Sequence, residues 1–147
     1  MLAYDPATNP LNNNEWSFPL AECFHIAAFA MSVGTISIVD LRILGWGMVH
    51  QKPSQLLRDT SLWTLAGLII TITAGMIIFT TGPLVYYYNY AFRLKIACLV
   101  VAIVYNYTIH KKIAQSDDTG PVGKLVAAVS LLLWVTIVFC GLFFAFT

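Results

Sequence analysis

The chain has 147 residues, of which 59% are hydrophobic and 10% are charged, and its mean hydropathy is +0.75. A soluble domain of this length carries about 25% charged residues, so the composition excludes an ordinary soluble domain and indicates an integral membrane protein. The formal net charge of +1 gives no reason to expect nucleic-acid binding. No phosphate-binding loop and no nucleophile–base pair stands out in the sequence, which argues against a kinase or a hydrolase.

Four apolar runs follow one another along the chain, at about 18–41, 62–82, 92–110 and 122–146. Each is close to the ~20 residues that a helix needs to cross a bilayer. Helices are expected because backbone polar groups in lipid must be satisfied within the segment. The connections are short, so consecutive helices should be antiparallel neighbours. The sequence therefore predicts an all-α, four-helix transmembrane bundle that forms a single domain over residues 1–147.

The basic residues predict the orientation of this bundle. Most of them follow the first and third runs: Arg42, Lys52, Arg58, Lys111, Lys112 and Lys124. The N-terminal segment has none, and the remaining loop is bordered only by Arg93 and Lys95. By the positive-inside rule, both termini should lie on the outer side of the membrane. At that outer surface Tyr86, Tyr87, Tyr88 and Tyr90 are typical of an interfacial aromatic belt.

The first run carries ionisable residues that hydrocarbon does not tolerate easily. At about 100° per residue, Glu22, His25, Ser32 and Asp40 fall on one face of a helix. Such a face belongs inside the bundle, where polar groups find partners. Asp40 lies about 22 Å beyond His25 along the axis, so the face divides into two layers. Glu22 and His25 form an outer layer, and Asp40 with Arg42 forms an inner one.

The outer layer has predicted partners in the third run, which opens with "AFRLK". Arg93 and Lys95 lie there at a depth similar to that of Glu22. Lys95 shares a face with Asn106 and His110 and is expected to turn into the bundle, whereas Arg93 should extend to the interface. A Glu22–Lys95 ion pair would account for these charges structurally. The alternative is that they surround a cofactor.

The inner layer is expected to be mainly structural. Asp40, Arg42 and Asn106 would anchor the inner end, pairing with neighbouring groups or with lipid phosphate. His50 and His110 lie near the inner surface and are expected either to be solvated or to cap helix ends. They could also approach each other from two helix ends and form a separate inner pair that binds a cofactor.

A histidine on the inward face of a membrane four-helix bundle indicates b-type haem first. Haem iron takes a neutral imidazole, and the two propionates need Arg or Lys nearby. His25 with Arg93 and Lys95, next to Glu22, matches this pattern. The outer layer has no second histidine, and Met76 lies off the small-residue ridge of its helix, where packing is the expected role. His25 would therefore be the only histidine ligand of such a haem.

Three other functions remain open from the residues alone. Copper would suit His25 or His110 as metal ligands, although no Met-x-Met, Cys-x-x-Cys or His-x-His spacing occurs. A proton or ion route along the polar face of the first helix is a second possibility, weakened by the long apolar gap before Asp40. The third is a non-catalytic accessory subunit of a larger membrane complex.

Three segments carry a family resemblance: "PLAECFHIAAFAMSVGTISIVDLRILG", "AFRLK" and "NYTIH". They resemble the landmarks of a largely uncharacterised family of small four-helix bacterial membrane proteins, with "VDLR" at residues 39–42 as the most specific mark. The chain is also distantly similar to the membrane domain of copper-resistance D-type proteins and to small b-type cytochromes, matched at His25 and Lys95. The resemblance implies a multi-pass protein of the bacterial inner membrane, and the outer side predicted for both termini would then be the periplasm.

Together these observations predict a small membrane protein that binds haem b and serves electron transfer, rather than a stand-alone enzyme. Its expected partners are membrane lipids and other subunits of a respiratory or redox complex. The alternatives are a metal or ion transport protein of the copper-resistance D type, with copper as its cofactor, and an accessory subunit.

Overall fold

The computed structural model describes residues 5–144, and all regular secondary structure within that range is helical. Four helices are long and apolar enough to cross a membrane: α1 (Ser17–Leu44), α2 (Pro53–Phe79), the third span (Tyr90–Gln115) and α6 (Pro121–Phe144). The third span comprises α4 (Tyr90–Tyr105), the π-helical segment η2 (Asn106–His110) and α5 (Lys111–Gln115). Two short helices, η1 (Pro6–Thr8) and α3 (Pro83–Tyr88), lie outside the spans. The predicted all-α class with four spans is confirmed.

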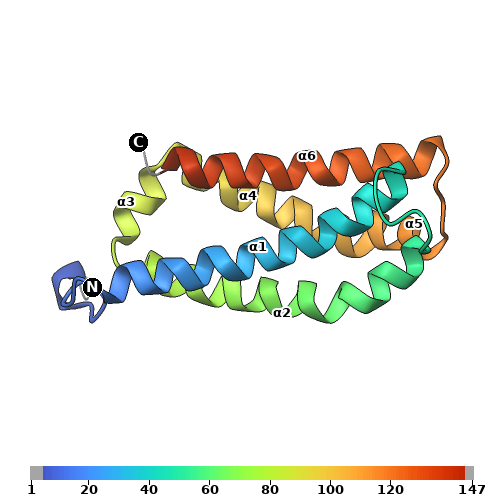
Figure 1. Cartoon of the computed structure of the whole chain (residues 1–147). Helices are drawn as coiled ribbons and strands as arrows, with labels where there is room; N and C mark the ends of the chain where they lie inside the picture. Colours follow the sequence, from blue (N-terminus) through green and yellow to red (C-terminus); the bar gives the residue numbers. More distant parts are fainter. Residues whose placement is uncertain (1–4, 145–147) are drawn as a thin grey trace.

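The four spans run up and down along one bundle axis (Figure 1). The beginning of α1, the helix α3 and the end of α6 lie together at one end, which we call the α3 end. The α1–α2 connection and α5 lie at the opposite end, which we call the α5 end. Consecutive spans are antiparallel, as the short connections predict.

The second span differs most from its predicted limits, because α2 begins at Pro53 rather than at 62. Polar residues such as Arg58 and Asp59 resemble a loop in sequence, but they continue the helix beyond its apolar part. Proline at the first helical position suits this start, since its missing N–H has no helical partner there. The third span likewise runs past 110 to Gln115. The predicted last residues of the fourth span, 145 and 146, and the predicted domain limits at 1 and 147 lie outside the described residues.

Small side chains bring α1 and α2 together. A β-carbon on Gly67 of α2 would lie 2.8 Å from the Ala28 carbonyl oxygen of α1, so only glycine fits there. Nearby, Ser32 Oγ donates across the interface to the Thr64 carbonyl oxygen at 3.1 Å, and the hydroxyls of Thr35 and Thr64 are 2.7 Å apart. Small and hydroxyl-bearing residues favour such close packing in membranes, where helix association relies on contacts and hydrogen bonds.

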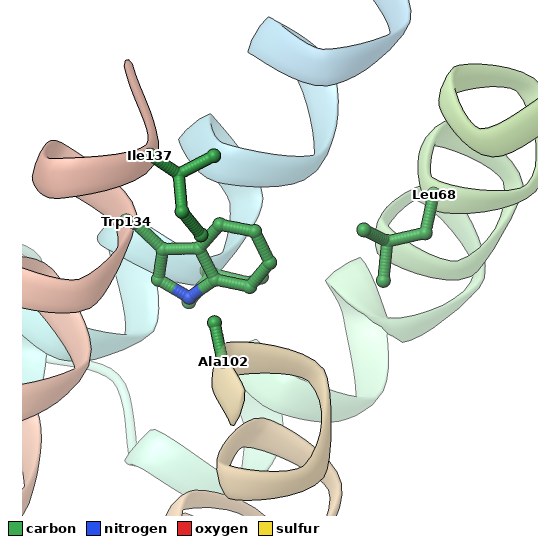
Figure 2. Close-up of a cluster of buried hydrophobic side chains, with 5 residues drawn as sticks. Leu68, Ala102, Trp134 and Ile137 are labelled. Atoms are coloured by element: carbon green, nitrogen blue, oxygen red, sulfur yellow. The ribbon is translucent and has the colours of Figure 1, made fainter. Parts of the chain in front are cut away.

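A compact apolar cluster fills the middle of the bundle and draws on all four spans (Figure 2). Trp134 and Ile137 come from α6, Ile36 from α1, Leu68 from α2 and Ala102 from α4. Trp134, the largest fully buried side chain of the described residues, is 1% exposed. Most other large apolar side chains of the spans face outward, since only 11–33% of each apolar stretch is buried. This outward apolar surface is what a lipid environment requires.

Candidate functional site

A buried polar network lies within the bundle toward the α5 end and joins three spans. His110 Nε2 is 2.6 Å from Asp40 Oδ1, and Ser130 Oγ donates to Asp40 Oδ2 at 2.7 Å. Asp40 and Ser130 are 0% exposed, and His110 is 1% exposed. The Asp40–His110 contact is the only close contact between an acidic and a basic side chain within the part of the chain that the structure describes. Asp40 thus uses both carboxylate oxygens for partners on other helices.

Burial makes this pairing necessary. A carboxylate removed from water loses several kcal/mol of hydration, which an oppositely charged or hydrogen-bonding partner must offset. Asp40 has two such partners, from the third span and from α6. The order of the contacts does not match a nucleophilic triad, because Ser130 is bonded to the carboxylate and not to the imidazole of His110. The network therefore holds a charge or a proton inside the bundle.

The π-helical segment η2 positions the histidine of this network. Such wider turns occur mostly as single insertions within α-helices, frequently at functional sites. Asn106 and His110, the first and last residues of η2, are both buried. Asn106 Oδ1 and His110 Nδ1 have no hydrogen-bond partner, although both atoms are shielded from solvent. Both carboxylate oxygens of Asp40 therefore have hydrogen-bond partners, whereas Asn106 Oδ1 and His110 Nδ1 have none among the described residues.

The structure places Arg42, His50 and His110 of the predicted inner layer in three different environments. Arg42 Nε donates to the carbonyl oxygen of Gln51, so this arginine ties the end of α1 to the following loop. His50 is exposed in that loop, while His110 is buried and bonded to Asp40. No hydrogen bond joins His50 to His110 among the described residues.

At the α3 end, His25 bridges α1 to α2. Its Nδ1 lies 2.9 Å from the carbonyl oxygen of Thr71, which can only accept, so Nδ1 carries a proton and donates it. In the neutral ring this leaves the lone pair on Nε2. A β-carbon on Gly75 would lie 3.0 Å from His25 Cε1, so the ring packs directly on the backbone of α2. His25 is half-buried and has a fixed tautomer.

Lys95 is half-buried between α4 and α6, as its predicted inward orientation requires. Its Nζ would be 3.4 Å from a β-carbon placed on Gly141. Glu22 and Lys95 both lie close enough to His25 to interact with it electrostatically, but no ion pair joins them among the described residues. Glu22 and Arg93 are exposed. The expected Glu22–Lys95 ion pair is therefore not present, and Lys95 makes no hydrogen bond or ion pair within residues 5–144.

Neither His25 nor the Asp40–His110 pair belongs to a larger cluster of metal-ligating side chains among the described residues. Within residues 5–144, no group of three or more His, Cys, Asp or Glu side chains is arranged to hold a metal ion. Met76 is 68% exposed on the outside of α2. A metal at His25 would thus have fewer than three His, Cys, Asp or Glu ligands among the described side chains.

Ser130 is the residue of the buried network that the sequence analysis missed. It lies in the apolar stretch "LVAAVSLLLW", where a single serine does not interrupt the apolar pattern. The available signal is its spacing, since Gly123, Ala127, Ser130 and Trp134 follow one another at helical intervals and are all buried. A lone hydroxyl on the small-residue face of a span is a sign of an interhelical hydrogen bond.

Comparison with known proteins places the chain in a family. The model of a family of unknown function, DUF6644, matches residues 17–147, which is nearly the whole chain. No curated protein and no solved structure matches it. The more distant similarity to copper-resistance D-type domains and b-type cytochromes therefore stays a prediction. By the extent of the family match, the chain belongs to DUF6644, a family of unknown function.

Proposed function

We propose that this protein binds b-type haem through His25 and serves electron transfer within the membrane. The observation that carries the proposal is the hydrogen bond from His25 Nδ1 to the Thr71 carbonyl oxygen. Metal-ligating histidines almost always donate their second ring N–H to a carbonyl or carboxylate, which fixes the tautomer and orients the other nitrogen. In His25 this leaves Nε2 as the nitrogen available to iron.

The charge near His25 supports the same ligand. A half-buried lysine without a hydrogen bond or a direct ion pair is unfavourable in a membrane, and an anion in contact with it would relieve this cost. Lys95 is such a residue, and it lies near His25. A haem propionate is a suitable anion, and Arg93 at the surface could bind the second propionate.

The residues present fit haem through one histidine and one or two cations. When bound, haem iron supplies one-electron redox chemistry. The chain orients the ligand through Thr71, and the absence of a side chain at Gly75 lets the imidazole pack against the backbone of α2. Copper is less well supported, because the described residues offer no group of three or more His, Cys, Asp or Glu side chains that could hold the ion. We regard a metal transport role as the second possibility for the same residue.

We further propose that the protein lies in a bacterial inner membrane with both termini in the periplasm. In support, six of the eight Lys and Arg residues, namely Arg42, Lys52, Arg58, Lys111, Lys112 and Lys124, belong to the α5 end or its loops. This is the asymmetry that the positive-inside rule describes. Lipids would cover the apolar outer faces of the spans, and other subunits of a redox complex would supply and accept the electrons.

The test is an absorption spectrum of the full-length protein, expressed with added haem precursor and purified in mild detergent. We expect a Soret band in the oxidised protein that shifts on reduction, together with bound iron. His25→Gln should abolish the band, since glutamine can still donate to Thr71 but is a poor iron ligand. His50→Gln, which alters an exposed histidine, should keep it.

Two outcomes would contradict the proposal. One is a folded wild-type protein that contains neither a Soret band nor iron after expression with haem precursor. The other is a His25→Gln variant whose spectrum and iron content match those of the wild type. Lys95→Gln serves as a further check, because loss of a propionate-binding cation should weaken haem retention while leaving the ligand in place.

A further inference from the structure

A small cavity opens beside the buried network, between α1, α2 and the third span. Its volume is about 70 Å³, enough for roughly two water molecules at the ~30 Å³ each occupies in the liquid. Polar side chains of all three helices reach it, among them Thr35, Thr64, Asn106 and His110. Lys111, which is exposed, also lines it. The cavity thus reaches from the buried histidine to Lys111, the first residue of α5.

The two unsatisfied polar atoms of η2 belong to residues that line this cavity. Asn106 Oδ1 and His110 Nδ1 lack partners, and their residues are only 6% and 1% exposed. Buried polar atoms are nearly always hydrogen-bonded, so an unpaired pair next to a cavity indicates a ligand that the protein atoms do not supply. Asp40 does not line the cavity. The imidazole of His110 therefore reaches from the carboxylate to the cavity wall.

We propose that the Asp40–His110 pair is a proton-binding site, loaded from the α5 end by water in this cavity. The starting state has an ionised Asp40 and a neutral His110 whose Nε2–H donates to Asp40 Oδ1. A hydronium ion in the cavity transfers its proton to the lone pair of His110 Nδ1 and leaves water. The product is an imidazolium bonded to a carboxylate. The proposal does not depend on haem at His25, which lies about 22 Å away along α1.

The charge balance of the pair favours this uptake. Before protonation the buried site carries one negative charge, and afterwards its two charges cancel. In a low-dielectric interior the neutral combination costs less hydration energy than the isolated carboxylate. Ser130 stabilises the carboxylate in both states through Oδ2. Release of the proton restores the starting state, as a relay requires.

The other ionisable groups near His110 do not replace Asp40. Lys111 and Tyr107 adjoin it on the third span, and both are exposed. Tyr105 donates its hydroxyl to the Val126 carbonyl oxygen of α6. The residues that α2 contributes to the cavity are not ionisable: Leu57, Thr60, Ser61 and Thr64. Asp40 is therefore the one buried acid in contact with His110 within residues 5–144.

A metal ion fits this site less well than a proton. Asp40 does not line the cavity, and each of its oxygens already has a partner in His110 or Ser130. Within residues 5–144 no third His, Cys, Asp or Glu joins them. A divalent ion would have to rely on one imidazole nitrogen and neutral oxygens, next to Lys111.

The test is ¹⁵N NMR of the full-length protein labelled at histidine, in nanodiscs, over about pH 5 to 9. The signals of His110 are assigned as those lost in His110→Gln. We expect Nδ1 to gain a proton as the pH falls, while Nε2 stays protonated throughout. Asp40→Asn should weaken proton affinity at His110 by about tenfold or more, because the favourable charge is lost. Ser130→Ala, which keeps the ion pair, should weaken it less.

The route through the cavity is tested separately. Thr60 lines the cavity and its hydroxyl donates to the Leu56 carbonyl oxygen of its own helix, so Thr60→Leu narrows the cavity without touching the network. We expect slower proton exchange at His110 with the same titration midpoint. Thr136→Leu is the matched control, since this exposed threonine also bonds only within its own helix. It should leave both the rate and the midpoint unchanged.

Three results would overturn the proposal. In the first, His110 keeps one protonation state across the whole pH range in the folded wild type. In the second, Asp40→Asn and Ser130→Ala both leave the titration unchanged. In the third, zinc or copper ions added at constant pH shift the Nδ1 signal while pH alone does not, which would make the site a metal site.

Discussion

Gly67 of α2 and Ser32 of α1 are so close that a β-carbon on the glycine would overlap the serine hydroxyl. The same hydroxyl donates to the Ala28 carbonyl oxygen at 3.3 Å and to the Thr64 carbonyl oxygen at 3.1 Å. The closest approach of the two helices is therefore combined with a buried hydrogen bond that crosses between them. This contact lies about midway between the His25 site and the Asp40 network along α1.

Replacing Gly67 by alanine should destabilise the bundle. The new methyl group would meet Ser32 and the backbone of α1, so the helices must separate or the serine must give up its bond. Overpacking of this kind costs about 1–3 kcal/mol. The measurement is reversible unfolding in mixed detergent micelles, followed by circular dichroism. Gly34→Ala is the control, because a β-carbon there meets nothing within 4 Å, and this variant should be no less stable than the wild type.

The Asp40–His110 pair should show strong coupling in a double-mutant cycle. His110→Leu alone leaves the Asp40 carboxylate buried without its main partner, and we expect a loss of about 3–5 kcal/mol of unfolding free energy. Asp40→Leu together with His110→Leu removes both polar partners and should cost clearly less than the sum of the single changes. The same unfolding assay measures all four proteins. Additive losses would show that the two side chains stabilise the bundle independently.

Asp117, in the loop after α5, should give the protein an acid-sensitive contribution to stability. The backbone N–H of Ser54, in the first turn of α2, donates to Asp117 Oδ1 at 2.9 Å and lowers the pKa of this carboxyl group. Lys52 and Arg42 add smaller effects in the same direction. Because the folded state favours the ionised form, this stabilisation is present above the pKa of the unfolded chain, about 3.9, and disappears as pH falls through the lower folded value.

The measurement for Asp117 compares thermal unfolding of the wild type with that of Asp117→Asn. Asparagine retains an acceptor oxygen and tolerates the positive φ of 55° at this position, so the backbone turn is kept. We expect a lower melting temperature for the variant at neutral pH and convergence of the two proteins in strong acid. A difference that persists unchanged at low pH would show that charge at this residue is not involved.

The fold was predictable because a lipid environment allows few backbone structures. Apolar runs of bilayer length must be helices, and short loops must make them antiparallel. The start of α2 was mispredicted because residues such as Arg58 and Asp59 lie in helix beyond the apolar part, where hydropathy no longer marks the span. The helical face of α1 was also predictable, since Ser32 and Asp40 both proved buried. Glu22, assigned to the same face, is exposed near the start of the helix.

The partners of the polar residues could not be predicted in the same way. Asp40 pairs with residues 70 and 90 positions away, and such contacts depend on how each helix is rotated about its axis. A helical face narrows the choice but does not select between Arg42, His110 and Ser130. The contacts of the aromatic residues could not be predicted either. Tyr87, Tyr88 and Tyr90 are exposed, whereas Tyr86 stacks on Phe144 with ring centroids 4.9 Å apart.

The π-helical segment η2 makes the alignment of the third span sensitive to a single residue. An α-helix advances about 100° per residue, and a π-turn accommodates one extra residue within about the same rotation, so everything after η2 would be turned by roughly that angle if the same residues formed ordinary α-helix. His110 would then turn away from Asp40, and Lys111 and Lys112 would move around the helix with it. One additional residue in this turn thus decides whether the two halves of the span can face their partners at the same time.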